Sequence, residues 1–252
     1  MQQGIGRSGE ATVVVEWGMA GIASLRAQVA VLVIVDVLSF STAVDVAVSR
    51  GAAIIPFPSG DKQAAGAAAA EAGAVLAQPR AAGGGAFSLS PASLITIPAG
   101  TKLLLPSPNG ARLSLAGGER TVIAGCLRNA AAVAAAARAL AGGGAIGVIP
   151  AGEGWPDASL RPAIEDLLGA GAIVHHLALP CTAEARVARD AFRTAGADLA
   201  QLIADSVSGR ELVARGFPAD VDLAVALQSS HCVPILRDGA YRAWQPPAVP
   251  PT

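Results

Sequence analysis

The stretch Val31–Thr42, VLVIVDVLSFST, decides the fold class expected for this chain. An apolar, strand-like run ends on the carboxylate Asp36, and a turn containing Ser39 and Ser41 leads directly into a helical pattern. Ligands of open α/β sheets bind beyond the carboxyl ends of the strands, so Asp36, Ser39 and Ser41 are expected at a functional site. A buried carboxylate is costly without a partner, which a metal ion or a hydrogen-bonded turn could supply. A plain helix cap is the alternative role for Asp36.

Strand-like and helical patterns alternate along the chain. Strand-like runs occur at 12–17, 30–37, 53–57, 74–77, 101–105, 121–124 and 145–150, and helical patterns at 41–50, 61–72, from about 111, from 129, from 161 and over most of 183–214. The stretch 78–97 is expected to be a loop, and the sequence around Asp238–Gly239 a hairpin. The alternation favours a mainly parallel sheet covered on both faces. With no break in composition, residues 1–252 are expected to form a single α/β domain with a frayed tail at about 245–252.

Composition narrows the class of protein. The chain has 252 residues, of which 52% are hydrophobic and 15% charged, so it can bury a large core and is unlike a disordered chain. Its net charge of −1 gives no general electrostatic reason to expect nucleic acid or an anionic membrane as a partner. The longest apolar runs are too short to span a bilayer, and the N-terminus lacks the apolar core of a signal peptide. A soluble, cytoplasmic protein is therefore expected.

A second turn suited to chemistry follows the strand-like run at 101–105. It contains Ser107, Asn109 and Gly110, with Arg112 in the first turn of the expected helix. Free amide groups and the positive end of a helix dipole make such a turn a ready anion site. Arg112 could add a bidentate contact to phosphate or sulfonate. The alternative is an ordinary strand-to-helix turn with a surface arginine.

Two further turns contain polar side chains. Asn129 is well placed as a helix N-cap, and that role alone could explain it. Glu153 lies between two glycines and could reach a ligand, whereas the adjacent Glu165 and Asp166 point about 100° apart on a helix, so that usually only one faces a given cleft. Asp36, Glu153 and one of this pair could form an oxygen-only cluster, which suits Mg²⁺.

Taken together, these segments resemble the 2-phosphosulfolactate phosphatase family. The similar segments follow the family's order from about Val14 to Gly239, and they are VIVDVLSFSTAVDVAVSRGA, LLLPSPNGARLSLAGG, GCLRNAAAVA, IPAGEGW with IEDLLGAGAIV, and DLAVALQSSHCVPILRDG. The resemblance implies a three-layer α/β/α fold with a mainly parallel, mixed sheet, and a homo-oligomer, expected to be a dimer. It also implies Mg²⁺-dependent hydrolysis of the phosphate ester of a sulfolactate, which in some organisms is a step towards coenzyme M.

The resemblance implies catalytic and metal-binding roles for five of these residues. Asp36 with Glu165 and Asp166 would hold Mg²⁺, directly or through water, and the metal would offset charge on the phosphoryl group. Glu153 would be the general base for water, or an outer ligand of the metal. Asn109 would orient substrate oxygens. Attack by water is favoured over attack by Asp36, because Asp36 is followed by Val37 and Leu38 and so does not begin an Asp-x-Asp motif of the aspartyl-phosphate type.

A second group of residues is expected to bind the substrate. Arg112 and the Gly110 amide would bind its phosphate or sulfonate, and Asn129 would orient its oxygens. The full expected substrate-binding set is Ser39, Ser41, Ser107, Gly110, Arg112 and Asn129.

The chain departs from the family pattern in places. Ser39 stands where the family turn has an arginine, and the 78–91 stretch, QPRAAGGGAFSLSP, keeps few polar groups, among them Arg80. Three interpretations stay open: a Mg²⁺-dependent phosphatase acting on 2-phosphosulfolactate or a related phosphorylated hydroxy acid, a diverged small-anion-binding homologue with little or no activity, and an interaction protein that kept only the fold.

Overall fold

A mixed sheet runs through the molecule. The computed structural model describes residues 12–58, 60–80 and 87–245. In this part the sheet order is β1 (Val13–Val15), β7 (Ile146–Pro150), β2 (Val31–Val35), β6 (Thr121–Gly125), β10 (Pro234–Arg237), β11 (Ala240–Ala243), β3 (Ala53–Pro58), β5 (Lys102–Ser107) and β4 (Val75–Leu76). The first four strands are mutually parallel, and so are the last three. The predicted α/β class with a mainly parallel, mixed sheet is confirmed.

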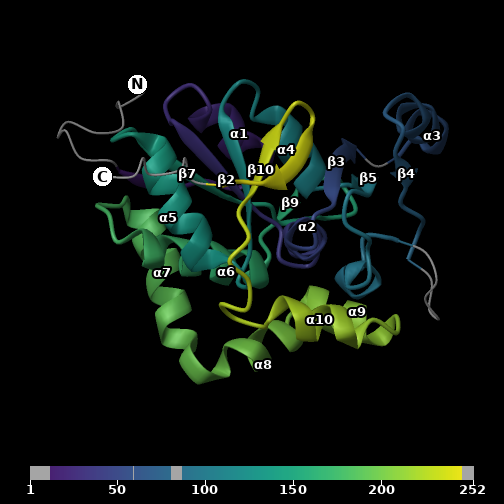
Figure 1. The fold of residues 1–252 in the computed structure, drawn as a ribbon. Helices are drawn as coiled ribbons and strands as arrows, with labels where there is room; N and C mark the ends of the chain where they lie inside the picture. Colours follow the sequence, from purple (N-terminus) through teal and green to yellow (C-terminus); the bar gives the residue numbers. More distant parts are fainter. Residues whose placement is uncertain (1–11, 59, 81–86, 246–252) are drawn as a thin grey trace, which may run out of the picture.

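Helices cover both faces of this sheet (Figure 1). The α-helices of the described part are α1 (Gly18–Leu25), α2 (Phe40–Ser49), α3 (Lys62–Glu71), α4 (Gly110–Ala116), α5 (Ala130–Ala141), α6 (Ile164–Leu177), α7 (Ala183–Ala195), α8 (Leu199–Ala204), α9 (Val207–Ala214) and α10 (Pro218–Ala224). Two 3₁₀ turns, η1 (Pro91–Leu94) and η2 (Gly196–Asp198), and a small hairpin of β8 (Glu153–Gly154) and β9 (Leu160–Arg161) complete the order. None of these helices is long and apolar enough to cross a membrane.

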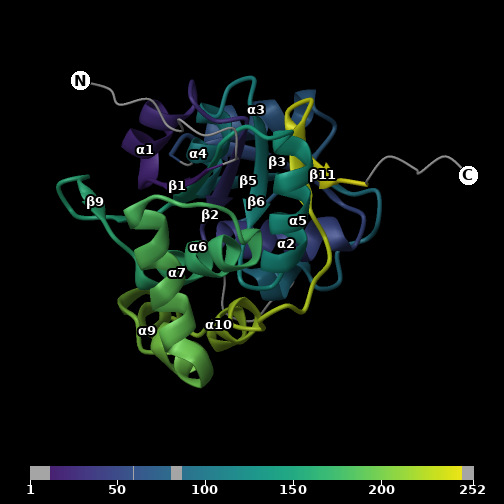
Figure 2. The ribbon, with the colours of Figure 1, turned by 90° about the vertical axis from the view of Figure 1, so that its left-hand side faces the viewer.

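Alternation along β2 shows how the three layers are held together. Val31, Val33 and Val35 belong to a buried cluster with α5, α6 and α7, which Figure 2 shows side by side. Leu32 and Ile34 face the other way, into a cluster with α1, α2 and α4. Successive strand side chains point to opposite faces, so a strand that is apolar throughout must be covered on both sides.

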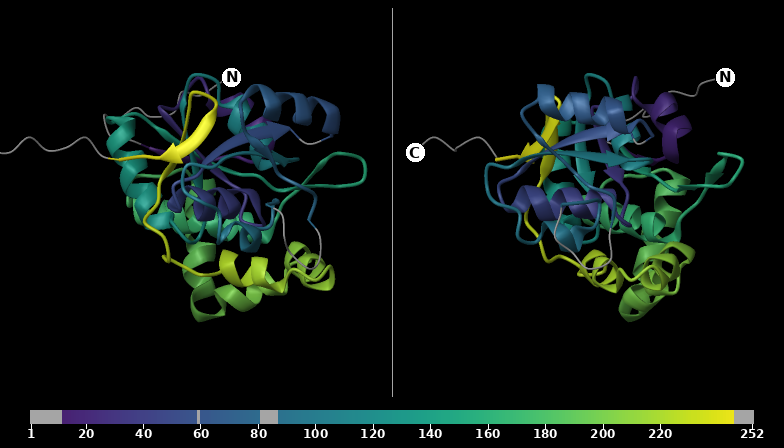
Figure 3. Two further views of the ribbon diagram at one scale, coloured as in Figure 1. Left: turned by 45° about the vertical axis from the view of Figure 1, so that its right-hand side comes forward. Right: turned by 90° about the vertical axis from the view of Figure 1, so that its right-hand side faces the viewer.

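The C-terminal hairpin explains why the sheet is mixed. Strands β10 and β11 pair with each other and lie between the two parallel groups, with Ile235 opposite Ile123 of β6 and Tyr241 opposite Ile54 of β3. Figure 3 shows this hairpin in yellow. The predicted turn at Asp238–Gly239 is confirmed, and both residues have positive φ, as a tight hairpin turn requires.

The sheet is strongly curved, and this curvature builds the site. Four strands separate β2 from β5 in the sheet order. Even so, the amide of Gly110, just after β5, lies 2.9 Å from Oδ2 of Asp36, just after β2. Neighbouring strands lie about 4.8 Å apart, so a flat sheet would hold these groups more than 20 Å apart, at roughly five spacings. The curved sheet therefore brings two distant strand ends together.

The sequence-based predictions missed several elements and misplaced the start of one helix. Helices α1 and α10 and the β8–β9 hairpin were not predicted, the stretch 78–97 contains η1, and α6 begins at Ile164 rather than at Arg161, which belongs to β9. The glycines of α1 disfavour a helix, but Ile22 and Leu25 bury themselves in the core and outweigh that preference. The tail was predicted at about 245–252, of which residues 246–252 lie outside the described residues.

Candidate functional site

A polar pocket of about 200 Å³ lies at the carboxyl ends of β2 and β5. Its lining residues come from distant parts of the chain and are Asp36, Leu38, Ser39, Arg80, Leu89, Ser107, Pro108, Asn109, Glu153, Ser208, Glu211, Leu212 and Arg215. Five residues expected at a site are thus brought together: Asp36, Ser39, Ser107, Asn109 and Glu153. Their location agrees with the general rule for ligands of α/β sheets.

Asp36 is a buried carboxylate held rigidly by two helix starts. Its side chain accepts hydrogen bonds from the amides of Phe40 (3.1 Å) and Gly110 (2.9 Å), one on each oxygen, and the residue is only 6% exposed. Burial raises the pKa of Asp36, as does the charge of Glu165, while the two amides lower it. Asp36 therefore binds the first amide of α2, whose N-cap residue is Ser39, and also lines the pocket.

Glycine is required at position 110 because the chain passes very close to Phe40. A Cβ added at Gly110 would lie 2.3 Å from Cδ1 of the Phe40 ring, well inside van der Waals contact. We expect Gly110→Ala to destabilise the protein by about 1–3 kcal/mol through overpacking. Urea unfolding measures this loss.

Gly66 provides the matched control for that substitution. It lies in α3, and a Cβ added there meets nothing within 4 Å. Gly66→Ala should stabilise the helix by about 0.5–1 kcal/mol. Equal effects of the two substitutions would contradict the close-packing argument.

Glu153 can exchange a proton near neutral pH. Burial raises its pKa to about 7, and the nearby charge of Asp36 acts in the same direction. Its Oε2 accepts a 2.9 Å hydrogen bond from Nδ2 of Asn109, which lowers the pKa and fixes the direction of the carboxyl group. A carboxyl group with a pKa near the working pH is suited to general acid–base catalysis.

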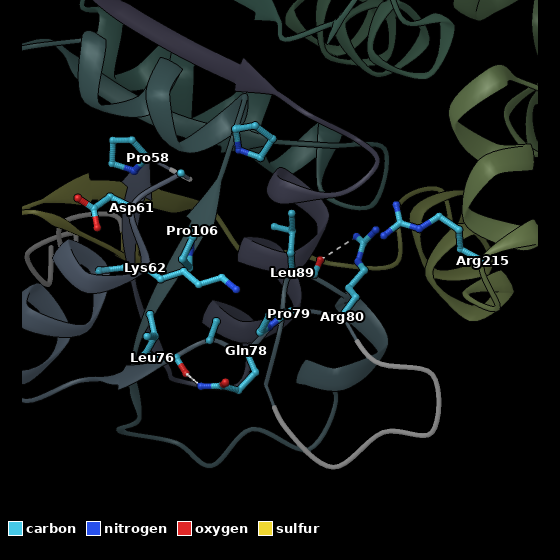
Figure 4. A pocket seen from close by; sticks show the side chains of 14 residues that line it. Pro58, Asp61, Lys62, Leu76, Gln78, Pro79, Arg80, Leu89, Pro106 and Arg215 are labelled. Carbon is cyan, nitrogen blue, oxygen red and sulfur yellow. Dashed lines mark hydrogen bonds between the residues drawn. The ribbon is translucent and has the colours of Figure 1, made fainter. Parts of the chain in front are cut away.

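Two arginines bring positive charge to the pocket. Arg80 donates through Nη2 to Oγ of Ser39 (2.5 Å) and to the carbonyl of Leu89 (3.0 Å), and its Nε lies 3.6 Å from Oδ2 of Asp220. Figure 4 shows the Arg80 and Arg215 side chains converging from opposite sides. Burial lowers the pKa of Arg80, the charge of Asp220 raises it, and the charge of Arg215 lowers it again. Two converging guanidinium groups favour an anion between them.

The base of the pocket contains an unsatisfied hydroxyl group. Ser107 is 1% exposed, and its Oγ has no hydrogen-bond partner among the residues that the structure describes. A buried polar atom without a partner is costly, so an unpaired hydroxyl on a pocket wall indicates a ligand that would bind it.

Asp220 supports the arginine side of the pocket from α10. It is 1% exposed, and its Oδ1 accepts hydrogen bonds from Oγ of Ser90 (2.5 Å) and from the amide of Ala92 (3.1 Å). With Arg80 beside its other oxygen, this carboxylate joins α10 to the η1 turn and to the pocket wall.

Glu165 and Asp166 begin α6 beneath the pocket and do not line it. Asp166 accepts hydrogen bonds from the amides of Val37 (2.7 Å) and Gly152 (2.8 Å), so it ties the ends of β2 and β7 together. Burial, and then the charges of Asp36 and Glu165, raise the pKa of Asp166 well above its usual range. Both members of the pair are buried and neither lines the pocket, so the expectation that one of them would face the same cleft as Asp36 and Glu153 was wrong.

The carboxylates partly fit a magnesium ion. Burial and the charge of Glu165 raise the pKa of both Asp36 and Asp166, so a cation nearby would be stabilised. Across residues 12–58, 60–80 and 87–245, no three His, Cys, Asp or Glu side chains are arranged to hold a metal ion. Mg²⁺ keeps several waters and commonly uses one or two carboxylates together with substrate phosphate. Asp36, which lines the pocket, fits that limited role.

Other expected site residues lie away from the pocket. Ser41 is buried below it, where its Oγ accepts from the amide of Asp36 (3.1 Å) and donates to the carbonyl of Ile34 (3.0 Å). Arg112 is exposed and does not line the pocket, and the Gly110 amide is already bonded to Asp36. The positive charge comes instead from Arg80 and Arg215.

Asn129 lies at the start of α5, also outside the pocket. Its Oδ1 accepts from the amide of Cys126 (2.9 Å), and its Nδ2 donates to the carbonyl of Cys232 (3.2 Å). Asn129 is the N-cap residue of α5, as expected from the sequence, but its side chain makes no capping hydrogen bond to that helix. Asn129 instead joins the β6 turn to the segment before β10.

Sequence reasoning missed the contribution of the C-terminal helices. Ser208, Glu211, Leu212 and Arg215 line the pocket from α9 and its C-cap, although no local pattern marks this stretch as functional. The one sequence signal for Arg80 is that it is a basic residue in a stretch, 78–91, with few polar groups.

Comparison with protein-family models identifies the family of the chain. A protein-family model described as 2-phosphosulpholactate phosphatase matches residues 22–239, a range that includes every residue lining the pocket. A search of curated proteins gave no match.

Proposed function

Because the chain belongs to the 2-phosphosulpholactate phosphatase family, we propose that it hydrolyses the phosphate monoester of a small hydroxy acid, 2-phosphosulfolactate or a relative, in a Mg²⁺-dependent reaction. The observation that supports this most strongly is the pairing of two carboxylates, Asp36 and Glu153, with two guanidinium groups, Arg80 and Arg215, around one small pocket. Phosphoryl transfer needs both a group that handles protons and groups that neutralise phosphate charge.

The phosphate would bind between the arginines and Ser107. Arg80 and Arg215 would each donate to phosphoryl oxygens, and the Ser107 hydroxyl, which lacks a partner among the described residues, would donate to a third. Asp36 would hold Mg²⁺ with Glu165 nearby, and the bound ion would neutralise charge on the phosphoryl oxygens.

Glu153 would accept the proton of the attacking water. As the water oxygen bonds to phosphorus, the bond from phosphorus to the ester oxygen breaks, the leaving alkoxide takes a proton from a solvent water to become the hydroxy acid, and Glu153 later returns its proton to solvent. Both oxygens of Asp36 already accept amide hydrogen bonds, which weakens them as nucleophiles. This supports water rather than Asp36 as the attacking group.

The proposal is tested by phosphate release from racemic 2-phosphosulfolactate, with Mg²⁺ and with EDTA. Release that EDTA abolishes is the expected result. If no phosphate is released while sulfate or phosphate raises the melting temperature, the protein is the anion-binding homologue without turnover. If folded protein neither releases phosphate nor is stabilised by sulfate or phosphate, it shares only the fold with the family.

The arginine role gives a separate prediction. Arg215 is exposed on the pocket rim, so Arg215→Ala should raise KM about tenfold, as expected for loss of a charged hydrogen bond, without changing the melting temperature. Arg112→Ala is the control. It also removes an exposed arginine, but one in the first turn of α4 that does not line the pocket, and it should leave KM unchanged. A larger effect from Arg112→Ala would restore the anion role expected from the sequence.

The homo-oligomeric state and the cytoplasmic location stay predictions. Light scattering on the purified chain measures the first of them.

A further inference from the structure

A second, larger cavity adjoins the candidate phosphate site. It measures about 600 Å³, against about 200 Å³ for the polar pocket, and the two share Arg80, Leu89, Pro108 and Arg215 as walls. Figure 4 views this cavity and shows both arginines at its edge. A ligand whose phosphate lies between these arginines would therefore have open space beside its organic part.

The walls of the larger cavity are mainly apolar and rigid. They are formed by the ends of β3, β4 and β5 and by α3, which contribute Pro58, Leu76, Pro106 and Ala65. Prolines have a fixed φ, so such walls lose little freedom when a ligand binds. Apolar walls with few polar groups are typical of sites for organic ligands, whose pockets usually measure about 300–1,000 Å³.

Lys62 and the carboxylate Asp61 line the cavity at a distance from the arginines, and Asp61 already accepts a hydrogen bond from the amide of Ala64 (2.9 Å). Lys62, in the first turn of α3, extends its side chain across the cavity towards the side on which Arg80 lies (Figure 4). The whole chain contains only two lysines, Lys62 and Lys102. A ligand that filled the cavity could therefore meet an ammonium group at some distance from its phosphate.

We propose that the natural substrate is a phosphate monoester with an extended apolar chain that ends in a second acidic group. The chain lies in the larger cavity against Leu76 and the prolines, and the terminal acid pairs with Lys62. This inference rests on the proposed function for the position of the phosphate, but it names a longer substrate than sulfolactate. A three-carbon acid would leave the larger cavity unfilled.

Calorimetric titration with phosphonates tests this without any turnover. The probes are phosphonoacetate, 8-phosphonooctanoate and octylphosphonate, each in the presence of Mg²⁺. We expect 8-phosphonooctanoate to bind at least tenfold more tightly than phosphonoacetate, because its methylene groups leave water. Equal dissociation constants for these two would overturn the proposal.

Variants separate the two parts of the cavity. Leu76→Trp should abolish the advantage of the long probe and leave phosphonoacetate binding unchanged, and Gln78→Trp, at an exposed lining residue, gives the same test should Leu76→Trp fold poorly. Lys62→Gln should weaken 8-phosphonooctanoate several-fold but not octylphosphonate, with the exposed Lys102→Gln as control. Equal losses for all probes would contradict a chain-binding cavity.

The binding result and the phosphatase result can fail independently. Tight binding of the long probe without phosphate release from any ester would refute the proposed hydrolysis and keep the cavity assignment. Hydrolysis of 2-phosphosulfolactate with no preference for long probes would support the proposed hydrolysis and refute the cavity assignment.

Discussion

Asp36→Asn is expected to lower kcat/KM for phosphate release by about 10³-fold, because it removes a buried charge that both lines the pocket and could hold the metal. The substitution keeps the size of the side chain and the acceptor for the Phe40 amide. It places an NH₂ group opposite the Gly110 amide, so a modest fall in melting temperature is expected as well. Phosphate release is measured beside thermal unfolding.

Asp157→Asn is the control for this substitution. Asp157 lies on the exposed β8–β9 turn, where its carboxylate accepts hydrogen bonds from the amide and the hydroxyl of the nearby Ser159. Its removal should leave kcat/KM unchanged. Wild-type activity in folded Asp36→Asn protein would exclude Asp36 from the chemistry and would leave the pocket as an anion-binding site.

Glu153→Gln is expected to lower kcat by about 10²–10⁴-fold and to remove one limb of the pH profile. As a general base, Glu153 must lose its proton, so wild-type kcat/KM should rise with pH through about 7 and level off above it. The groups that set this pKa besides burial are Asp36 and Glu165, which raise it, and Asn109 and Arg161, which lower it. A pH–rate profile from 5 to 9 measures the effect.

Asn109→Ala tests the positioning of that base. The hydrogen bond from Asn109 lowers the pKa of Glu153, so its loss should move the acidic limb to higher pH, whereas a purely structural role would lower the rate at every pH alike. For Glu153→Gln, an acidic limb of the pH–rate profile that stays unchanged would show that another group titrates there. A limb that falls rather than rises with pH would make Glu153 the general acid.

Local sequence determined the elements of the fold more completely than their arrangement. The apolar run of β2, the cap of α3 at Asp61 and the Asp238–Gly239 turn all follow from interactions within a few residues. Helix α10 was missed although Pro218 stands at its first turn, a position that favours proline. It is short, and its stability depends on Asp220, whose partners lie about 130 residues away.

Some features of the site could likewise be predicted from the sequence, and others only from the tertiary structure. The sequence alone placed Asp36, Ser107, Asn109 and Glu153 just beyond strands, because a strand end is a local event and every strand of a parallel group ends at one edge. Only the tertiary structure decided that Gly110 bonds to Asp36, that Arg80 and Arg215 rather than Arg112 reach the pocket, and that Asn129 stays outside it. The physical reasons are the curvature of the sheet and the packing of α10 against α9 and the η1 turn. Both depend on contacts between residues far apart in the chain, which no local pattern records.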